Sequence, residues 1–275
     1  MLKTFKTAGS IWQRATDAEI GLIAAGIGFF GFLAIFPALA ALITIWGFAA
    51  DPIAVQTQMN MAQNYLPKEA FDLLNGQVQR ILATNSSSLG LTTLLSTVFA
   101  LWSARAGVGA LISGLNAIYG LPSRSGLRHL LRAFALTMVL IGLVMSGMVL
   151  AVIVPLILGF LPLGQGAAKA LGAANFILGM VLVLLSIALA YRLGPNHARG
   201  GPKPAFFSVG LFVALGLWIA VSRGLVFYLA NFANYNQVYG SIGAVVALLM
   251  WFYLSAYAVL LGAALNAERA AQRDQ

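Results

Sequence analysis

The sequence predicts an all-α polytopic membrane protein with six transmembrane helices, plus short amphipathic helices at the N-terminus and in the first outer loop. Three observations support this fold class. Hydrophobic residues make up 60% and charged residues 8% of the 275 positions, whereas soluble proteins contain roughly 25% charged residues. Apolar runs long enough to cross a bilayer recur along the chain. Basic residues gather in alternate connections between those runs, as the positive-inside rule requires.

The predicted spans are apolar runs of about 20 residues or more. The chain, 1–275, is predicted to form a single integral membrane domain, because the connections between these runs are short except at 50–88. The first run is much longer than the roughly 7 to 15 apolar residues of a signal peptide, so we expect it to be retained. The spans are 20–49, 89–117, 131–160, 170–191, 205–231 and 240–266.

The distribution of basic residues predicts that both termini lie in the cytoplasm. In this orientation, 11 of the 16 Lys and Arg residues fall on the inner side. The net charge of +9 then indicates contact with an anionic inner leaflet, so membrane lipids are the expected partners and nucleic acid is not. The inner basic residues are Lys3, Lys6, Arg14, Arg124, Arg128, Arg132, Arg192, Arg199, Lys203, Arg269 and Arg273.

Residues 1–18 show the pattern of an amphipathic helix. Apolar residues that include Phe5 and Trp12 fall on one helical face, and Lys6, Arg14 and Asp17 fall on the other. We expect this helix to lie on the inner leaflet. A disordered tail is the alternative, because a glycine weakens so short a helix.

The connection 50–88 is predicted to contain two short amphipathic helices outside the membrane. Asp51 followed by Pro52 is typical of a helix start, and Pro67 separates this helix from a second one. Capping of the bundle is the favoured role for this loop, and gating of a site is the alternative.

Arg105 and Arg223 lie deep within predicted spans, and none of the six spans contains Asp or Glu. A cation in hydrocarbon costs on the order of 2.5 to 3.5 kcal/mol by insertion scales. Because a guanidinium suits a carboxylate or phosphate, the functional hypothesis is an anionic ligand bound by both arginines, beside Ser103 and Ser222. The plainer and somewhat favoured interpretation is that each guanidinium reaches an interface or bonds backbone carbonyls.

The positions of the two arginines suggest two inverted halves of three spans each. Six spans divide into halves that run in opposite directions, so the second span corresponds to the fifth, and each of these contains one arginine. A pseudo-two-fold axis would bring the two together near mid-depth, as in many secondary transporters. The halves show no other convincing similarity, so this arrangement is a hypothesis.

Small residues and prolines are assigned to packing and movement. The row Gly216, Ala220 and Gly224 predicts a close helix contact in lipid. Hinges are a second hypothesis, although a structural kink is the default interpretation of a membrane proline. The hinge candidates are Pro37, Gly107 and Gly224.

An uncharged outer turn could line the mouth of a cavity. It contains Tyr235, Tyr239 and Ser241. A tight helical hairpin with interfacial tyrosines is the favoured alternative for this turn.

Catalysis, cofactors and metals are not predicted. The chain has no cysteine, and His129 and His197 stand alone on predicted inner loops, so no cluster supplies ligands for a catalytic metal. The serines in the spans have no buried base beside them. No Walker A sequence is present, so an ATP-driven mechanism would need another subunit.

Three motifs span nearly the whole chain. They are Ala24-Ala25-Gly26-Ile27-Gly28-Phe29-Phe30 leading to Ile35-Phe36-Pro37, Leu101-Trp102-Ser103-Ala104-Arg105 leading to Leu115-Asn116-Ala117-Ile118-Tyr119, and Val238-Tyr239-Gly240-Ser241-Ile242-Gly243-Ala244 leading to Leu265-Asn266-Ala267-Glu268. In this order and spacing they resemble the YihY/BrkB family of bacterial inner-membrane proteins. The chain departs from the usual first motif in having Phe30 where tyrosine is common and Ala34 where serine is common.

The resemblance implies six spans and a bacterial cytoplasmic membrane. Members of the family have carried a ribonuclease BN label, and the missing metal-binding carboxylates argue against that label for this chain. The resemblance does not supply an activity, although transport related to the cell envelope is the usual suspicion.

The sequence thus favours a transporter or flippase-like protein for an anionic lipid or a small anion. A non-transporting envelope scaffold or assembly factor is the alternative, and a ribonuclease is a distant third. A water-accessible cavity lined by the arginines would support transport, whereas a solid bundle would support a scaffold. The sequence makes no prediction of oligomeric state, substrate identity or energy source.

Overall fold

A computed structural model describes residues 2–49, 75–76, 79, 86–122, 126–160, 165–196, 205–232 and 241–273. All regular structure in these residues is helical, so the predicted all-α class is confirmed. The chain divides into two compact units. Unit 1 consists of Met1–Phe29 and Arg105–Gln275, and unit 2 consists of Phe30–Ala104.

The long helices follow the predicted spans closely, and four of their ends are shifted by four or more residues. The helices over the predicted spans 131–160 and 170–191 begin earlier, at Leu127 and Gln165. The predicted span 205–231 begins as a helix only at Val209, because the Ser208 Oγ accepts a hydrogen bond from the Leu211 N–H and caps the helix there. The last helix continues to Arg273, since the residues after the apolar run favour helix. The helices are α1 (Leu2–Asp17), α2 (Ile20–Ala49), α5 (Ser86–Ile118), α6 (Leu127–Phe160), α7 (Gln165–Leu193), α8 (Val209–Phe232) and α10 (Ser241–Arg273).

Within the described residues, four helices are long and apolar enough to cross a membrane. A fifth span results if Gly9–Asp17 and Ile20–Ile35, which are bent by 60°, count together. In α6, the shorter segment Leu130–Leu143 is apolar. The chain is therefore a multi-pass membrane protein, and the count of six spans and the inverted halves stay predictions. The four spans are Leu94–Ile118, Lys169–Leu193, Val209–Tyr228 and Val245–Gln272.

The core of unit 1 is made of small and branched apolar side chains, among them the fully buried Ala24, Leu115 and Leu260. α8 and α10 approach each other closely. A Cβ atom added at Gly210 would overlap the Gly262 carbonyl oxygen, and one added at Gly262 would overlap the Gly210 carbonyl oxygen. Only glycine at both positions allows the two backbones to meet in this way.

The predicted contact through Gly216 and Gly224 is wrong for the described residues. A Cβ atom added at either glycine would have no neighbour within 4 Å. The small residues that bring α8 against α10 lie near the start of α8 instead, at Gly210 and Ala214, which are both buried.

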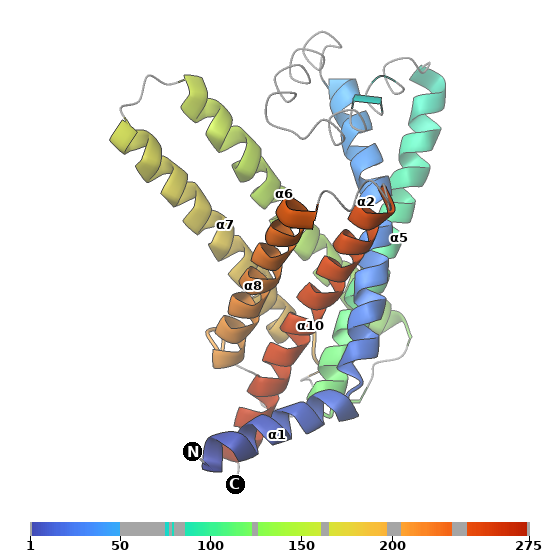
Figure 1. Cartoon of the computed structure of the whole chain (residues 1–275). Coiled ribbons are helices and arrows are strands. Elements are labelled where there is room, and N and C mark those ends of the chain that lie inside the picture. The colour runs from blue at the N-terminus through green and yellow to red at the C-terminus, as the bar shows by residue number, and fades with distance from the viewer. Residues whose placement is uncertain are drawn as a thin grey trace. The chain divides into compact units, whose positions relative to one another are not determined.

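α1 lies across the end of unit 1 at which α10 ends, so the first and last helices of the chain meet (Figure 1). The segment is thus a helix rather than a disordered tail, but its faces differ from the prediction. Ala15 and Ala18 are buried against the bundle, whereas Trp12 is 64% exposed. Because the small side chains at 15 and 18 allow close packing, this side of α1 lies against the bundle. Arg14 also contacts the bundle, whereas Trp12 lies on the opposite side of α1.

Several predicted features lie outside the described residues. Most of the connection 50–88, with its two predicted helices, is among them, as are Tyr235 and Tyr239. Pro37 lies within α2 and Ser241 opens α10, but their side chains are not described. The roles proposed for these residues therefore stay predictions.

Candidate functional site

Arg105 lies in α5 within the candidate span Leu94–Ile118, and its side chain is half-buried. Its Nε atom is buried and has no hydrogen-bond partner among the described residues. The Oγ atom of Ser255, in the α10 span, is buried without a partner in the same way. A buried polar atom without a partner is an exception in folded proteins, and an ordered water or a bound group is the usual explanation.

Arg223 has a different environment. It lies in α8 within the span Val209–Tyr228, and its side chain is exposed. Its neighbour Ser222 accepts a hydrogen bond of 3.1 Å from the Trp251 Nε1–H. This bond joins α8 to α10, so the hydroxyl of Ser222 is already used in helix packing.

The structure describes three further residues that were proposed from the sequence for a binding or hinge role. The hydroxyl of Ser103, in unit 2, is fully buried and has no partner in the described part of the chain. Gly107 is buried in α5, and Gly224 faces open space on α8. A common anion site for Arg105 and Arg223, and the hinge roles, stay predictions.

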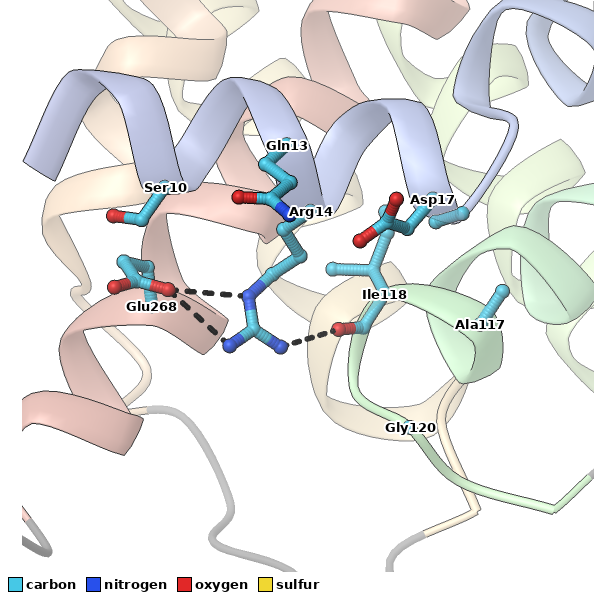
Figure 2. Close-up of a pocket in the computed structure, with 9 residues that line it drawn as sticks. Ser10, Gln13, Arg14, Asp17, Ala117, Ile118, Gly120 and Glu268 are labelled. Atoms are coloured by element: carbon cyan, nitrogen blue, oxygen red, sulfur yellow. Dashed lines mark hydrogen bonds and ion pairs between the residues drawn. The ribbon is translucent and has the colours of Figure 1, made fainter.

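A cavity of about 380 Å³ lies beneath α1 at the end of unit 1. We call it the α1 cleft. Its walls are α1, the end of α5 and the end of α10 (Figure 2). Polar and charged side chains dominate the wall formed by α1. The lining residues are Ser10, Gln13, Arg14, Asp17, Ala18, Ala117, Ile118, Gly120 and Glu268.

Arg14 joins the three walls of the α1 cleft. Its Nε and Nη2 atoms donate to Glu268 Oε2 at 3.3 and 3.2 Å, and its Nη1 atom donates to the Ile118 carbonyl oxygen at 3.2 Å. The ion pair is partly shielded, because the Arg14 and Glu268 side chains are 31% and 13% exposed. A carbonyl at a helix end carries partial negative charge, so both contacts of Arg14 are electrostatically favourable.

Asn266 forms a second polar junction next to the α1 cleft. Its Oδ1 accepts a 2.8 Å bond from the Gly210 N–H, and its Nδ2 donates a 2.8 Å bond to Ser208 Oγ. These bonds satisfy groups at the start of α8 that have no partner within the helix. The amide therefore fixes the start of α8 against α10, at the glycine contact between these helices.

Asn116 makes a comparable junction at the end of α5. Its Oδ1 accepts a 2.7 Å bond from the Asn196 backbone N–H, and Asn196 Nδ2 donates to the Pro122 carbonyl at 3.2 Å. Tyr119, just beyond α5, is held near the same region. Burial raises the pKa of its phenol to about 12, although a hydrogen bond with the Asn266 side chain acts in the opposite direction. The phenol therefore stays un-ionised at ordinary pH.

Sequence reasoning missed these junctions, yet a signal was present. Leu-Asn-Ala occurs at the end of two spans, as Leu115-Asn116-Ala117 and Leu265-Asn266-Ala267. An asparagine in an apolar helix must find hydrogen bonds when it is buried, so its recurrence indicates a polar junction. The role of Arg14 had no such signal, because its partners are more than 100 positions away.

Metal binding finds no support in the described residues, where no group of three or more His, Asp or Glu side chains could hold an ion. His197 lies outside these residues, and the side chain of His129 is not described.

Comparison with known proteins places these features in a family. The sequence profile of the family described as Virulence factor BrkB matches residues 11–275. The ribonuclease-like protein YfkH of Bacillus subtilis (strain 168) is 27% identical over 273 residues, which cover 94% of this chain and 92% of the relative. No solved structure matches the chain.

A second kind of relative matches over a shorter stretch. The UPF0761 membrane protein XCC0860 of Xanthomonas campestris is 38% identical over 96 residues, which cover 35% of this chain and 22% of the relative. The UPF0761 membrane protein XAC0937 of Xanthomonas axonopodis has the same identity and coverage.

Proposed function

The chain belongs to the BrkB family of membrane proteins, and from this premise we propose that it is a transporter or flippase-like protein for an anionic lipid or a small anion. The proposal rests on the Nε–H of Arg105, which lies in a candidate membrane span. This group is buried and has no hydrogen-bond partner among the described residues. A cation in this position is costly unless an anion or water completes its contacts.

The ligand of Arg105 would be a phosphate or carboxylate. A guanidinium presents donors in a planar fork that matches both groups, and its charge persists at any physiological pH. The hydroxyl of Ser255, which has no partner in the described part of the chain, adds a second polar atom to the interior of unit 1. Arg223, which is exposed, would meet the ligand at the surface of the bundle before or after Arg105.

The setting proposed for this activity is the bacterial cytoplasmic membrane, with six spans and both termini in the cytoplasm. The inner basic residues support this orientation through the positive-inside rule. The two inverted halves would give alternating access to Arg105 from the two sides.

A scaffold or assembly factor is the second candidate. It is favoured by one observation: the α1 cleft, which lies at the end of unit 1, is lined by neither Arg105 nor Arg223. A ribonuclease activity is not proposed, because the name of the Bacillus relative describes that protein and the described residues of this chain present no metal-binding group.

Lipid co-purification tests the first proposal. The variants are Arg105→Gln, Arg105→Lys and Arg223→Gln, with Lys169→Gln as a control because Lys169 is an exposed cation near the start of α7 that does not belong to the inner basic residues. Mass spectrometry should show that Arg105→Gln loses bound anionic lipid by about tenfold or more, the effect of one charge-assisted bond. Arg105→Lys should retain part of the bound anionic lipid.

The same variants separate transport from a scaffold role. In proteoliposomes, wild type should move a fluorescent phosphatidylglycerol between leaflets, and Arg105→Gln should not. An unchanged lipid profile together with unchanged lipid movement in Arg105→Gln would rule out the role assigned to Arg105.

A further inference from the structure

The α1 cleft combines a cavity and charges of both signs in a way that helix packing alone does not require. We propose that it binds the phosphoethanolamine head group of a zwitterionic lipid, with the phosphate beside Arg14 and Gln13 and the ammonium group beside Asp17. This site is separate from the Arg105 region and goes beyond the proposed transport function.

The size of the cavity fits such a ligand. Small-molecule sites have volumes of roughly 300 to 1,000 Å³, and the α1 cleft has about 380 Å³. It remains open although Arg14 already joins all three walls. The ion pair thus explains why α1 is attached to the bundle, but it does not explain why a cavity remains beside Arg14.

Arg14 keeps donors available for a phosphate. A guanidinium has five N–H groups, and the three contacts to Glu268 and Ile118 leave one N–H on each terminal nitrogen without a contact in the described part of the chain. Gln13 lines the same cavity from α1 and adds amide N–H donors. A phosphate that bound here would bridge the two terminal nitrogens of Arg14, at the end of the guanidinium that neither Glu268 nor the Ile118 carbonyl occupies.

Asp17 supplies the negative side of the α1 cleft. Figure 2 shows it farther along α1 than Arg14, on the side of Ile118. Arg14 forms its ion pair with Glu268, and no cation among the described residues forms an ion pair with Asp17. The three charged residues among the described lining residues therefore sum to one unit of negative charge, which is that of Asp17.

The position of Asp17 is unfavourable within its own helix. It is the last residue of α1, and a helix C-terminus carries partial negative charge that disfavours a carboxylate. An ammonium ligand would reverse this repulsion, and a primary ammonium has three N–H donors for the carboxylate and nearby carbonyls.

A lipid is the favoured source of this head group because of where α1 lies. α1 crosses the end of the apolar helices of unit 1 (Figure 1), which is the level of head groups when such helices span a bilayer. Trp12 is 64% exposed on the opposite side of α1, and tryptophan prefers the membrane interface. The α1 cleft would thus open at the depth at which phosphoethanolamine is found.

Native mass spectrometry of the purified full chain with defined lipids tests the proposal. Asp17→Asn and Glu19→Gln form a matched pair, because both remove one negative charge near the end of α1 and only Asp17 lines the cavity. Phosphatidylethanolamine binding should fall by about tenfold or more in Asp17→Asn, the loss of one charge-assisted bond, and stay unchanged in Glu19→Gln. Gln13→Ala should by itself also weaken phosphatidylethanolamine binding.

The lipid head group gives the second comparison. Phosphatidylcholine, which has no ammonium N–H, and phosphatidylglycerol, which has no ammonium group, should both bind at least about tenfold more weakly than phosphatidylethanolamine. Equal binding of all three lipids, or equal losses in Asp17→Asn and Glu19→Gln, would overturn the proposal. Binding of free phosphoethanolamine as tight as that of the lipid would overturn its lipid part.

The result is independent of the transport proposal. Arg105→Gln should leave phosphatidylethanolamine binding at the α1 cleft unchanged, whereas Asp17→Asn should leave the lipid bound at Arg105 unchanged. Each proposal can therefore fail without the other.

Discussion

Single side chains in unit 1 connect distant parts of the chain. Arg14 is the clearest case, since it bonds Glu268 at the other end of the sequence and the Ile118 carbonyl at the end of α5. A partly exposed ion pair contributes little on its own. The carbonyl bond adds to it, because an N–H bond from a charged donor to a shielded acceptor is stronger than a neutral one.

Replacement of Arg14 should therefore destabilise the protein by more than its ion pair alone. We expect Arg14→Gln to lower the free energy of unfolding by about 1 to 3 kcal/mol, with a coupling to Glu268→Gln of about 0.5 to 1 kcal/mol. Thermal unfolding of the two single variants and the double variant in detergent measures both values.

Arg269→Gln is the control for this experiment, since Arg269 is the exposed neighbour of Glu268. It should leave the thermal midpoint unchanged. Additive effects of Arg14→Gln and Glu268→Gln would mean that the two side chains do not stabilise each other.

Helix contacts show how much the positions of small residues matter. α8 contains several glycines, but only Gly210 lies against the backbone of α10, and Asn266 bonds its N–H at the same point. Spacing in the sequence indicated Gly216 and Gly224, which face open space. The reason is that a small residue indicates where a close approach is possible, whereas the partner helix decides where it occurs.

A matched pair of alanine substitutions in α8 tests this assignment. Gly210→Ala should destabilise the protein by about 1 to 3 kcal/mol or more, because the added carbon forces α8 away from α10. Gly216→Ala should be neutral or stabilising by up to about 1 kcal/mol, since alanine favours helix and nothing obstructs it. Thermal midpoints of both variants in detergent give the comparison; equal effects would contradict the backbone contact.

The described helices present apolar side chains to their surroundings, as a protein in lipid must. Large apolar side chains are exposed along α6 and α7, including Phe134, Phe176 and Ile177. The comparisons place the chain in a membrane protein family over residues 11–275. The number of spans and the orientation are properties of the whole chain, because they depend on every connection between helices.

Cysteine labelling tests the orientation without background, since the chain has no cysteine of its own. Thr16→Cys and Gln272→Cys should react with an impermeant maleimide only after the membrane is opened. Gly166→Cys, at the start of α7, should react in intact cells. The wild-type chain is the control. Labelling of Thr16→Cys in intact cells would contradict cytoplasmic termini, and equal labelling of all three would contradict the predicted spans.

The all-α membrane class and the approximate positions of the long helices were predictable from local sequence alone. Both follow from local physical rules: an apolar run of about 20 residues must satisfy its backbone hydrogen bonds internally, and in lipid a helix does so. The family resemblance was likewise carried by local motifs, and the match over residues 11–275 confirms it.

Which polar residues meet depends on the tertiary structure. It turned Arg14 toward Glu268, placed Asn266 at the start of α8, and enclosed the α1 cleft between three helices. Arg105 was proposed from the sequence because a charge in an apolar run is conspicuous wherever the helix packs. The sequence placed Arg14 only on the polar face of an amphipathic helix, because its contacts depend on how α1 lies against helix ends far away in the chain, and no local pattern contains that information.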